Sequence, residues 1–133
     1  MGKKEINGLS QSIFESYSSQ LLQVSKNIDQ DIQSAAELII NNSGKVVVCG
    51  LGKSGLIGQK IVATLCSTGT RSVYMHAAEA IHGDLGIYNP GDPTILISKS
   101  GNTEELVRLV PILKEFQSPL IAIVGLSLIH ISE

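Results

Sequence analysis

Apolar residues recur at steps of three and four along the first part of the chain, from Phe14 to Ile39. This spacing places them on one face of a helix. The polar run 41–44 then ends the pattern. We therefore expect one long helix, or two consecutive helices, before residue 41. The apolar positions are Phe14, Tyr17, Leu21, Val24, Ile28, Ile32, Ala35 and Ile39.

The rest of the chain alternates between short apolar runs and helical patterns. The runs resemble strands because they are short, rich in β-branched residues and bounded by glycine, proline or polar residues. In one helical pattern Ile57, Ile61 and Leu65 repeat at steps of four. A second pattern follows Thr103, which can cap a helix, and is expected to bend at Pro111. The four predicted strands are 45–49, 72–75, 94–97 and 119–124.

Strands that alternate with helices in this way are typical of a parallel sheet with helices on both faces. The predicted fold class is α/β, a three-layer αβα sandwich with a mainly parallel sheet, preceded by an N-terminal helical segment. Residues 1–43 form that segment of a single domain, 44–125 its core and 126–133 an atypical tail. The polar stretch 76–86 is expected to be a loop.

Composition narrows the class of protein. The chain has 133 residues, of which 43% are hydrophobic, and a formal net charge of −2 with scattered basic residues. We therefore expect one globular domain that binds no nucleic acid. No apolar run approaches the roughly 20 residues that span a bilayer, so we expect a cytoplasmic protein without a membrane partner. Cys49 and Cys66 lie in apolar segments, which predicts buried thiols and no nucleophile.

The first strand leads into the glycine-rich loop 50–55, which contains Gly52, Lys53 and Ser54. A helix start of this kind presents backbone amides to an anion, and a lysine suits a phosphorylated ligand. The same letters fit the dinucleotide pattern GxGxxG, but that pattern needs an acidic residue about 20 positions later. Residues 70–74 contain none. A glycine turn that serves only close packing is the other alternative.

The third strand leads into residues 98–105, where Ser98, Ser100 and Thr103 precede a predicted helix. Hydroxyls and unpaired amides at a helix start form a second candidate anion site. An ordinary helix cap with solvated serines is the alternative. In an open parallel sheet, ligands bind beyond the carboxyl ends of the strands, where both loops are predicted to lie.

Between the two loops, residues 76–84 carry two histidines and two carboxylates. On a helix His76, Glu79 and His82 would not stack on one face, and the HExxH spacing is absent. We therefore expect no metal site and no cofactor. An imidazole beside Gly83 suits proton transfer or a hydrogen bond to a sugar hydroxyl, and a structural histidine is the alternative.

The segments GKVVVCGLGKSG, STGT, HAAEAIHGDLG and ISKSGNTEE, in this order, resemble the SIS domain of arabinose-5-phosphate isomerases. The resemblance extends from about residue 44 to residue 125. It implies a helix-flanked parallel sheet, a bound sugar phosphate, and interconversion of D-ribulose 5-phosphate and D-arabinose 5-phosphate. That reaction supplies the octulosonate sugar of bacterial lipopolysaccharide. The resemblance also implies a homo-oligomer, dimer or tetramer.

By position in the family motifs, Lys53, His82 and Glu105 are the implied catalytic residues. Glu105 would be the base or its supporting carboxylate, His82 would exchange protons with the sugar oxygens, and Lys53 would stabilise the developing oxyanion. The resemblance also implies a set of phosphate-binding positions, to which we add the glycine-loop residues. The binding set is Gly52, Ser54, Ser98, Ser100 and Thr103.

The resemblance ends at residue 125. The tail 126–133 is expected to be foreign to the family, as in a truncated gene, so that the chain could lack activity. A different interpretation is a regulatory SIS module that binds a sugar phosphate without converting it. His82 and Glu105 favour catalysis, because a sensor needs no acid/base pair. A dinucleotide-binding domain is the third interpretation.

Overall fold

A computed structural model describes residues 2–26, 28 and 30–125 of the chain. The chain divides into two compact units, the first ending at Ala36 and the second beginning at Glu37. The tail 126–133, for which the sequence predicted a foreign origin, lies outside the described residues. No helix in the described ranges is long and apolar enough to span a bilayer.

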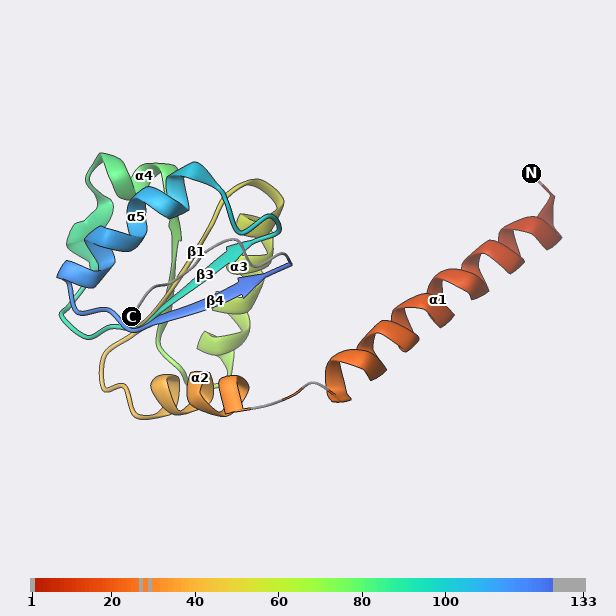
Figure 1. Cartoon of the computed structure of the whole chain (residues 1–133), viewed down its shortest axis with the longest axis horizontal. Helices are drawn as coiled ribbons and strands as arrows, with labels where there is room; N and C mark the ends of the chain where they lie inside the picture. Colours follow the sequence, from red (N-terminus) through yellow and green to blue (C-terminus); the bar gives the residue numbers. More distant parts are fainter. Residues whose placement is uncertain (1, 27, 29, 126–133) are drawn as a thin grey trace. The chain divides into compact units, whose positions relative to one another are not determined.

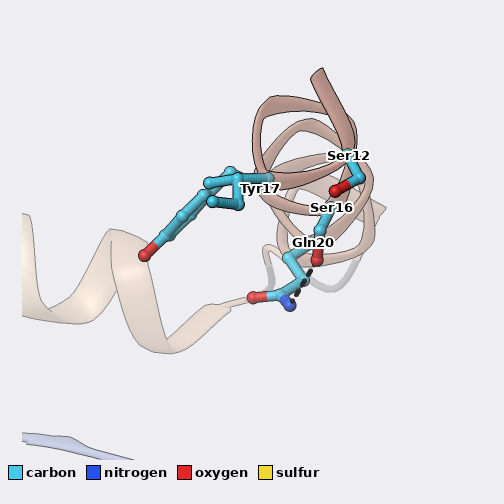
Figure 2. Close-up of a pocket in the computed structure, with 5 residues that line it drawn as sticks. Ser12, Ser16, Tyr17 and Gln20 are labelled. Atoms are coloured by element: carbon cyan, nitrogen blue, oxygen red, sulfur yellow. Dashed lines mark hydrogen bonds between the residues drawn. The ribbon is translucent and has the colours of Figure 1, made fainter. Parts of the chain in front are cut away.

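The first unit consists of helix α1 (Lys3–Lys26) and most of helix α2 (Gln30–Ile40). The expectation of two consecutive helices is confirmed. No residue of α1 is buried, and its apolar side chains are exposed. A hollow of about 310 Å³ lies on the surface of α1, and Figure 2 shows the side chains that line it. It is lined by Ser12, Ile13, Ser16, Tyr17 and Gln20.

The second unit contains a sheet of four parallel strands in the order β2-β1-β3-β4. The predicted α/β class with a parallel sheet is confirmed. The first three strands end one residue later than predicted because parallel pairing continues through Gly50, His76 and Ser98. The strands are β1 (Val46–Gly50), β2 (Ser72–His76), β3 (Thr94–Ser98) and β4 (Leu120–Val124).

Helices cover both faces of this sheet and complete the three predicted layers (Figure 1). Side chains alternate between the faces along each strand. Helices α4 (Ala77–His82) and α5 (Glu104–Glu115) cover one face, where Val47 and Leu96 are buried. Helix α3 (Gly52–Ser67) and Ile39 of α2 cover the other face. Residues buried on that face are Val46, Val48, Ile95 and Ile97.

Two predictions about individual segments are wrong. The expected loop 76–86 contains α4 and a short 3₁₀ helix, Asp84–Ile87. The helix forms because Ala77 and Ala80, one turn apart, are both fully buried in the core beside α5. Cys66 is exposed rather than buried, and its Sγ lies 3.4 Å from the carbonyl oxygen of Ser72. Cys49 is buried as expected, and burial raises the pKa of its thiol to about 12.

The amino ends of β1 and β3 are joined through the buried carboxylate of Asp92. Lys45 donates to it twice, from its backbone N–H at 3.1 Å and from Nζ at 2.6 Å. The backbone N–H of Asn89 donates at 2.9 Å. Burial alone raises the pKa of Asp92, but these hydrogen bonds and the charge of Lys45 outweigh it and lower the pKa. The charged carboxylate therefore stabilises the folded chain.

Replacement Asp92→Asn tests this link. Because the pKa of Asp92 is lowered in the folded state, the contribution of its carboxylate to the free energy of unfolding is fully present above the unfolded pKa, about 4. This contribution is lost as the pH falls from there through the folded pKa. We expect Asp92→Asn to lower the free energy of unfolding at pH 7 by about 1–3 kcal/mol and to reduce its dependence on pH in the acid range. Urea unfolding from pH 3 to pH 7 measures both.

Asp84→Asn, at an exposed aspartate, is the matched control and should leave the free energy of unfolding nearly unchanged. If the free energy of unfolding depended equally on pH in Asp92→Asn and in the unsubstituted chain, the Asp92 carboxylate would not be the stabilising group.

Candidate functional site

Three loops leave the sheet at the same edge. In the parallel register Gly50 of β1 is paired with His76 of β2 on one side and with Ile97 of β3 on the other. Neighbouring strands lie about 4.8 Å apart. The segments 50–55, 76–84 and 98–105 therefore begin within about 10 Å of one another across the carboxyl edge. The predicted location of the two candidate anion loops at this edge is confirmed.

The first loop turns directly into α3. Leu51 occupies the N-cap position in an extended conformation and makes no side-chain cap. Gly52 and Lys53 are exposed in the first turn of α3, and Ser54 is half-buried. Because no side chain caps this helix start, its backbone N–H groups can bind an anion. Lys53 adds a positive charge beside them.

A close approach of α3 to β1 and β2 holds this loop in place. The hydroxyl of Tyr74 donates to the carbonyl oxygen of Gly50 at 2.9 Å. A Cβ built on Gly55 would lie 2.4 Å from the same Tyr74 oxygen, so only glycine fits there without displacing it. The loop is evident from its glycines in the sequence, but the tyrosine that holds it is not.

The second loop is organised by a pair of hydroxyls. Ser98 Oγ lies 2.8 Å from Thr103 Oγ1 and accepts from the backbone N–H of Gly101 at 3.1 Å. Gly101 has a φ of +67°, in the left-handed region that favours glycine. Ser100 is exposed, and its Oγ accepts from the N–H of Asn102 at 3.3 Å.

Thr103 occupies the N-cap position of α5, as predicted, but its side chain does not cap the helix. Its hydroxyl pairs with Ser98 instead. The first backbone N–H groups of α5 therefore lack a side-chain acceptor, as they do in α3. Two uncapped helix starts at one edge of the sheet form a candidate anion-binding site.

The three predicted catalytic residues belong to three different helices. Lys53 lies in the first turn of α3, His82 is the last residue of α4 and Glu105 is the second residue of α5. Lys53 and His82 are exposed, whereas Glu105 is half-buried. Within the described ranges, no hydrogen bond or ion pair joins these side chains to one another. Their catalytic roles stay predictions.

The structure distinguishes Glu105 from its neighbour Glu104. Glu104 is exposed and forms an ion pair with Arg108, one turn further along α5. Glu105 precedes Leu106, which is fully buried, and lies four residues before the buried Leu109. Of the two carboxylates, Glu105 is therefore the one on the side of α5 that faces the molecule.

The position of His76 does not follow from the sequence pattern, which predicts only that it binds no metal. His76 ends β2 beside Gly50, and its Nδ1 is buried without a hydrogen-bond partner among the described residues. The signal that could have found it is its place at the end of a predicted strand. No group of three or more His, Cys, Asp and Glu side chains in the described residues could hold a metal ion.

Comparison with known proteins adds a second line of evidence. The sequence pattern of the SIS domain matches residues 39–132. A probable arabinose 5-phosphate isomerase of Haemophilus influenzae is 47% identical over 106 residues, which are 80% of this chain and 32% of that protein. The arabinose 5-phosphate isomerase KpsF of Escherichia coli O6:H1 strain CFT073 is 51% identical over 107 residues, 80% of this chain and 33% of that protein. The chain thus spans about a third of the length of these curated relatives.

A solved structure supports the same comparison. An E. coli CFT073 protein in complex with arabinose 5-phosphate matches with a TM-score of 0.86 and 35% identity. The match covers 93% of this chain and 66% of that one. At this identity and coverage, the described fold agrees with that of a protein that was solved with a ligand.

The close approach of α3 predicts a compensating pair of substitutions. Gly55→Ala should lower the free energy of unfolding by about 1–3 kcal/mol, because the new methyl group displaces the Tyr74 hydroxyl. Tyr74→Phe should lower it by about 1 kcal/mol through loss of the bond to Gly50. In the double variant the clashing oxygen is gone, so its loss should be smaller than the sum of the two single losses.

Urea unfolding of the four proteins gives the coupling. Additive losses would show that the tyrosine hydroxyl does not restrict position 55.

Proposed function

Because the chain belongs to the SIS domain family, we propose that its second unit is the substrate-binding core of an aldose-ketose isomerase. The proposed reaction interconverts D-ribulose 5-phosphate and D-arabinose 5-phosphate. The observation that carries the proposal is the pair of uncapped helix starts at the carboxyl edge of the sheet. Relatives that are 47–51% identical and named arabinose 5-phosphate isomerases support the choice of substrate, as does the solved neighbour in complex with arabinose 5-phosphate.

The phosphate group is proposed to bind at the start of α5. The pairing of Ser98 with Thr103 leaves the helix amides without a side-chain acceptor, so a phosphate can accept from them. Ser100 is exposed beside them and can donate its hydroxyl hydrogen. Gly52 and Ser54, in the first turn of α3, contribute from the neighbouring strand end.

The isomerisation transfers a hydrogen between the two carbons that share the carbonyl function. A base removes the proton from C2 of the open-chain aldose, an enediolate forms, and a proton returns to C1 while the oxygens exchange a hydrogen. Glu105 is proposed as the base or its supporting carboxylate, and His82 as the acid/base group for the oxygens. Lys53, beside the positive end of α3, stabilises the negative charge of the enediolate.

The cytoplasmic location and the supply of a lipopolysaccharide sugar stay predictions. The second is supported by the relatives named arabinose 5-phosphate isomerase.

A homo-oligomer is also part of the proposal. It is supported by the exposed apolar side chains along α1, since contiguous apolar surface of this kind is typical of interfaces. The hollow lined by Ile13 and Tyr17 lies on this helix.

The adjacent glutamates of α5 test the catalytic assignment. We expect Glu105→Gln to reduce isomerisation by about 100-fold or more, because an amide cannot accept the proton. Binding of D-arabinose 5-phosphate should stay within about threefold, since the proposed phosphate contacts remain. Glu104→Gln is the matched control and should behave like the unsubstituted protein, because the Glu104 carboxylate pairs with Arg108 at the exposed side.

Turnover and calorimetric binding are measured on the chain itself and on residues 1–125 joined to the remaining sequence of the KpsF relative. Unchanged turnover in Glu105→Gln would remove this residue from the mechanism. Tight binding without turnover in both forms would instead favour the regulatory module.

Substitutions on α1 test the oligomer. Phe14→Ser combined with Tyr17→Ser should convert a dimer or tetramer into smaller species, because both are large side chains exposed on α1, and aromatic side chains often contribute much of the binding energy at interfaces. Sedimentation velocity measures the change. Ser18→Glu, also exposed on α1, is the control. Identical sedimentation of the double variant and the unsubstituted chain would exclude this face of α1 as the interface.

A further inference from the structure

The glycine-rich loop is held from both faces of the sheet at the point where it leaves β1. The side chain of Leu51 packs against the core cluster under α4 and α5. The carbonyl oxygen of Gly50 accepts from the Tyr74 hydroxyl at 2.9 Å. Tyr74 lies on the α3 face, since its ring is 3.3 Å from a Cβ built on Gly58. Because a peptide unit is planar, these contacts fix the orientation of the backbone that leads into α3.

Helix α3 starts in direct contact with this strand end. A Cβ built on Gly50 would lie 3.0 Å from the backbone nitrogen of Gly55. The N–H of Gly55 donates to the carbonyl oxygen of Leu51 at 3.2 Å, which is the first hydrogen bond of the helix. The space that a Cβ of Gly55 would need is occupied by the Tyr74 oxygen. One hydroxyl group therefore lies against both ends of the loop.

Lys53 depends on this backbone for its position. Its side chain is exposed, and no ion pair among the described residues includes it. The residue before it, Gly52, has a φ of +56°, in the left-handed region that favours glycine. The direction of the lysine is therefore set by where the first turn of α3 begins, and not by a side-chain contact of its own.

Packing alone does not explain the hydroxyl of Tyr74. A phenylalanine ring would fill the same volume beside Gly58. The hydroxyl adds a hydrogen bond to Gly50, the last residue of β1, three positions before Lys53. Burial raises the pKa of Tyr74, so the hydroxyl keeps its hydrogen for this bond at neutral pH.

We propose that Tyr74 is a positioning residue, whose hydroxyl sets the start of α3 so that Lys53 is directed at the bound sugar phosphate. The inference rests on the proposed function and deepens it, since it names a residue on which the action of Lys53 depends. Tyr74 acts through the loop and makes no contact with the sugar phosphate. A group that stabilises an enediolate must be in place before the charge develops, so a small shift of the loop reduces turnover more than binding.

Two replacements of tyrosine by phenylalanine separate positioning from stability. Tyr88 is buried, and its hydroxyl accepts from Thr94 Oγ1 at 3.0 Å, at the amino end of β3. Tyr74→Phe and Tyr88→Phe each remove one hydrogen-bonded hydroxyl, so both should lower the midpoint of urea unfolding by similar amounts. Only Tyr74→Phe should lower kcat for D-arabinose 5-phosphate, by about tenfold, while KM stays within about threefold. Equal kcat in the two variants would overturn the inference.

Removal of the lysine shows whether Tyr74 acts through it. In the background of Lys53→Met the positioned charge is gone, so Tyr74→Phe should change kcat by less than about twofold. A further tenfold loss in the double variant would show that the hydroxyl does not act through Lys53.

Hydrogen exchange provides a readout that needs no turnover. The amide of Gly55 closes the first turn of α3, so Tyr74→Phe should accelerate its exchange about tenfold relative to the amide of Val48, which is buried in β1. Tyr88→Phe should leave this ratio unchanged. If Tyr74→Phe also left it unchanged, the hydroxyl would not set the start of the helix.

These outcomes separate the inference from the proposed function. Suppose that the chain has no isomerase activity, even when joined to the rest of the relative, and that Tyr74→Phe still accelerates exchange at Gly55 selectively. The proposed function would then be refuted, and Tyr74 would be upheld as the residue that sets the start of α3. An active isomerase in which Tyr74→Phe and Tyr88→Phe turn over equally would refute the inference alone.

Discussion

The candidate site depends on how closely α3 approaches the sheet. The hydrogen bond from Tyr74 to the carbonyl oxygen of Gly50 joins the end of β1 to β2, and Gly55 leaves the space that the tyrosine oxygen occupies. This contact determines where α3 begins, and with it the direction of the first-turn amides and of Lys53. A side chain larger than hydrogen at position 55 would displace the Tyr74 hydroxyl and weaken this contact.

The two uncapped helix starts arise in different ways. At α3 the N-cap position is occupied by Leu51, whose apolar side chain cannot accept a hydrogen bond. At α5 a residue that could cap is present, but Thr103 pairs with Ser98 and leaves the amides unbound. In both places the usual intramolecular acceptor is missing, so the electropositive end of the helix is available to an anion.

Sequence patterns predicted most of the fold, because buried parallel strands are short apolar runs separated by helical repeats. They failed at α4, where only the two alanines 77 and 80 are fully buried in the core and the other residues are polar or only half-buried. They also failed at Cys66. Its neighbours in the sequence are apolar, but the residue lies on the exposed side of α3. The loops that carry the site were predicted from their glycines and hydroxyls. The distinction between Glu104 and Glu105 follows from the local geometry of α5, since Glu104 pairs with Arg108 one turn later. The unpaired nitrogen of His76 instead depends on packing between distant segments, which no local pattern encodes.

The link between Asp92 and Lys45 lies at the amino ends of β1 and β3, and the candidate site lies at their carboxyl ends. Five residues of strand separate them, about 13 Å from the first to the last. At such a distance the energetic effects of substitutions are normally additive. The amino edge can therefore accumulate stabilising changes that offset the burden of polar, strained or unpaired groups required at the other edge. During evolution, the three loops of such a fold can change and bind new ligands, while residues at the amino edge keep the free energy of unfolding high enough for folding.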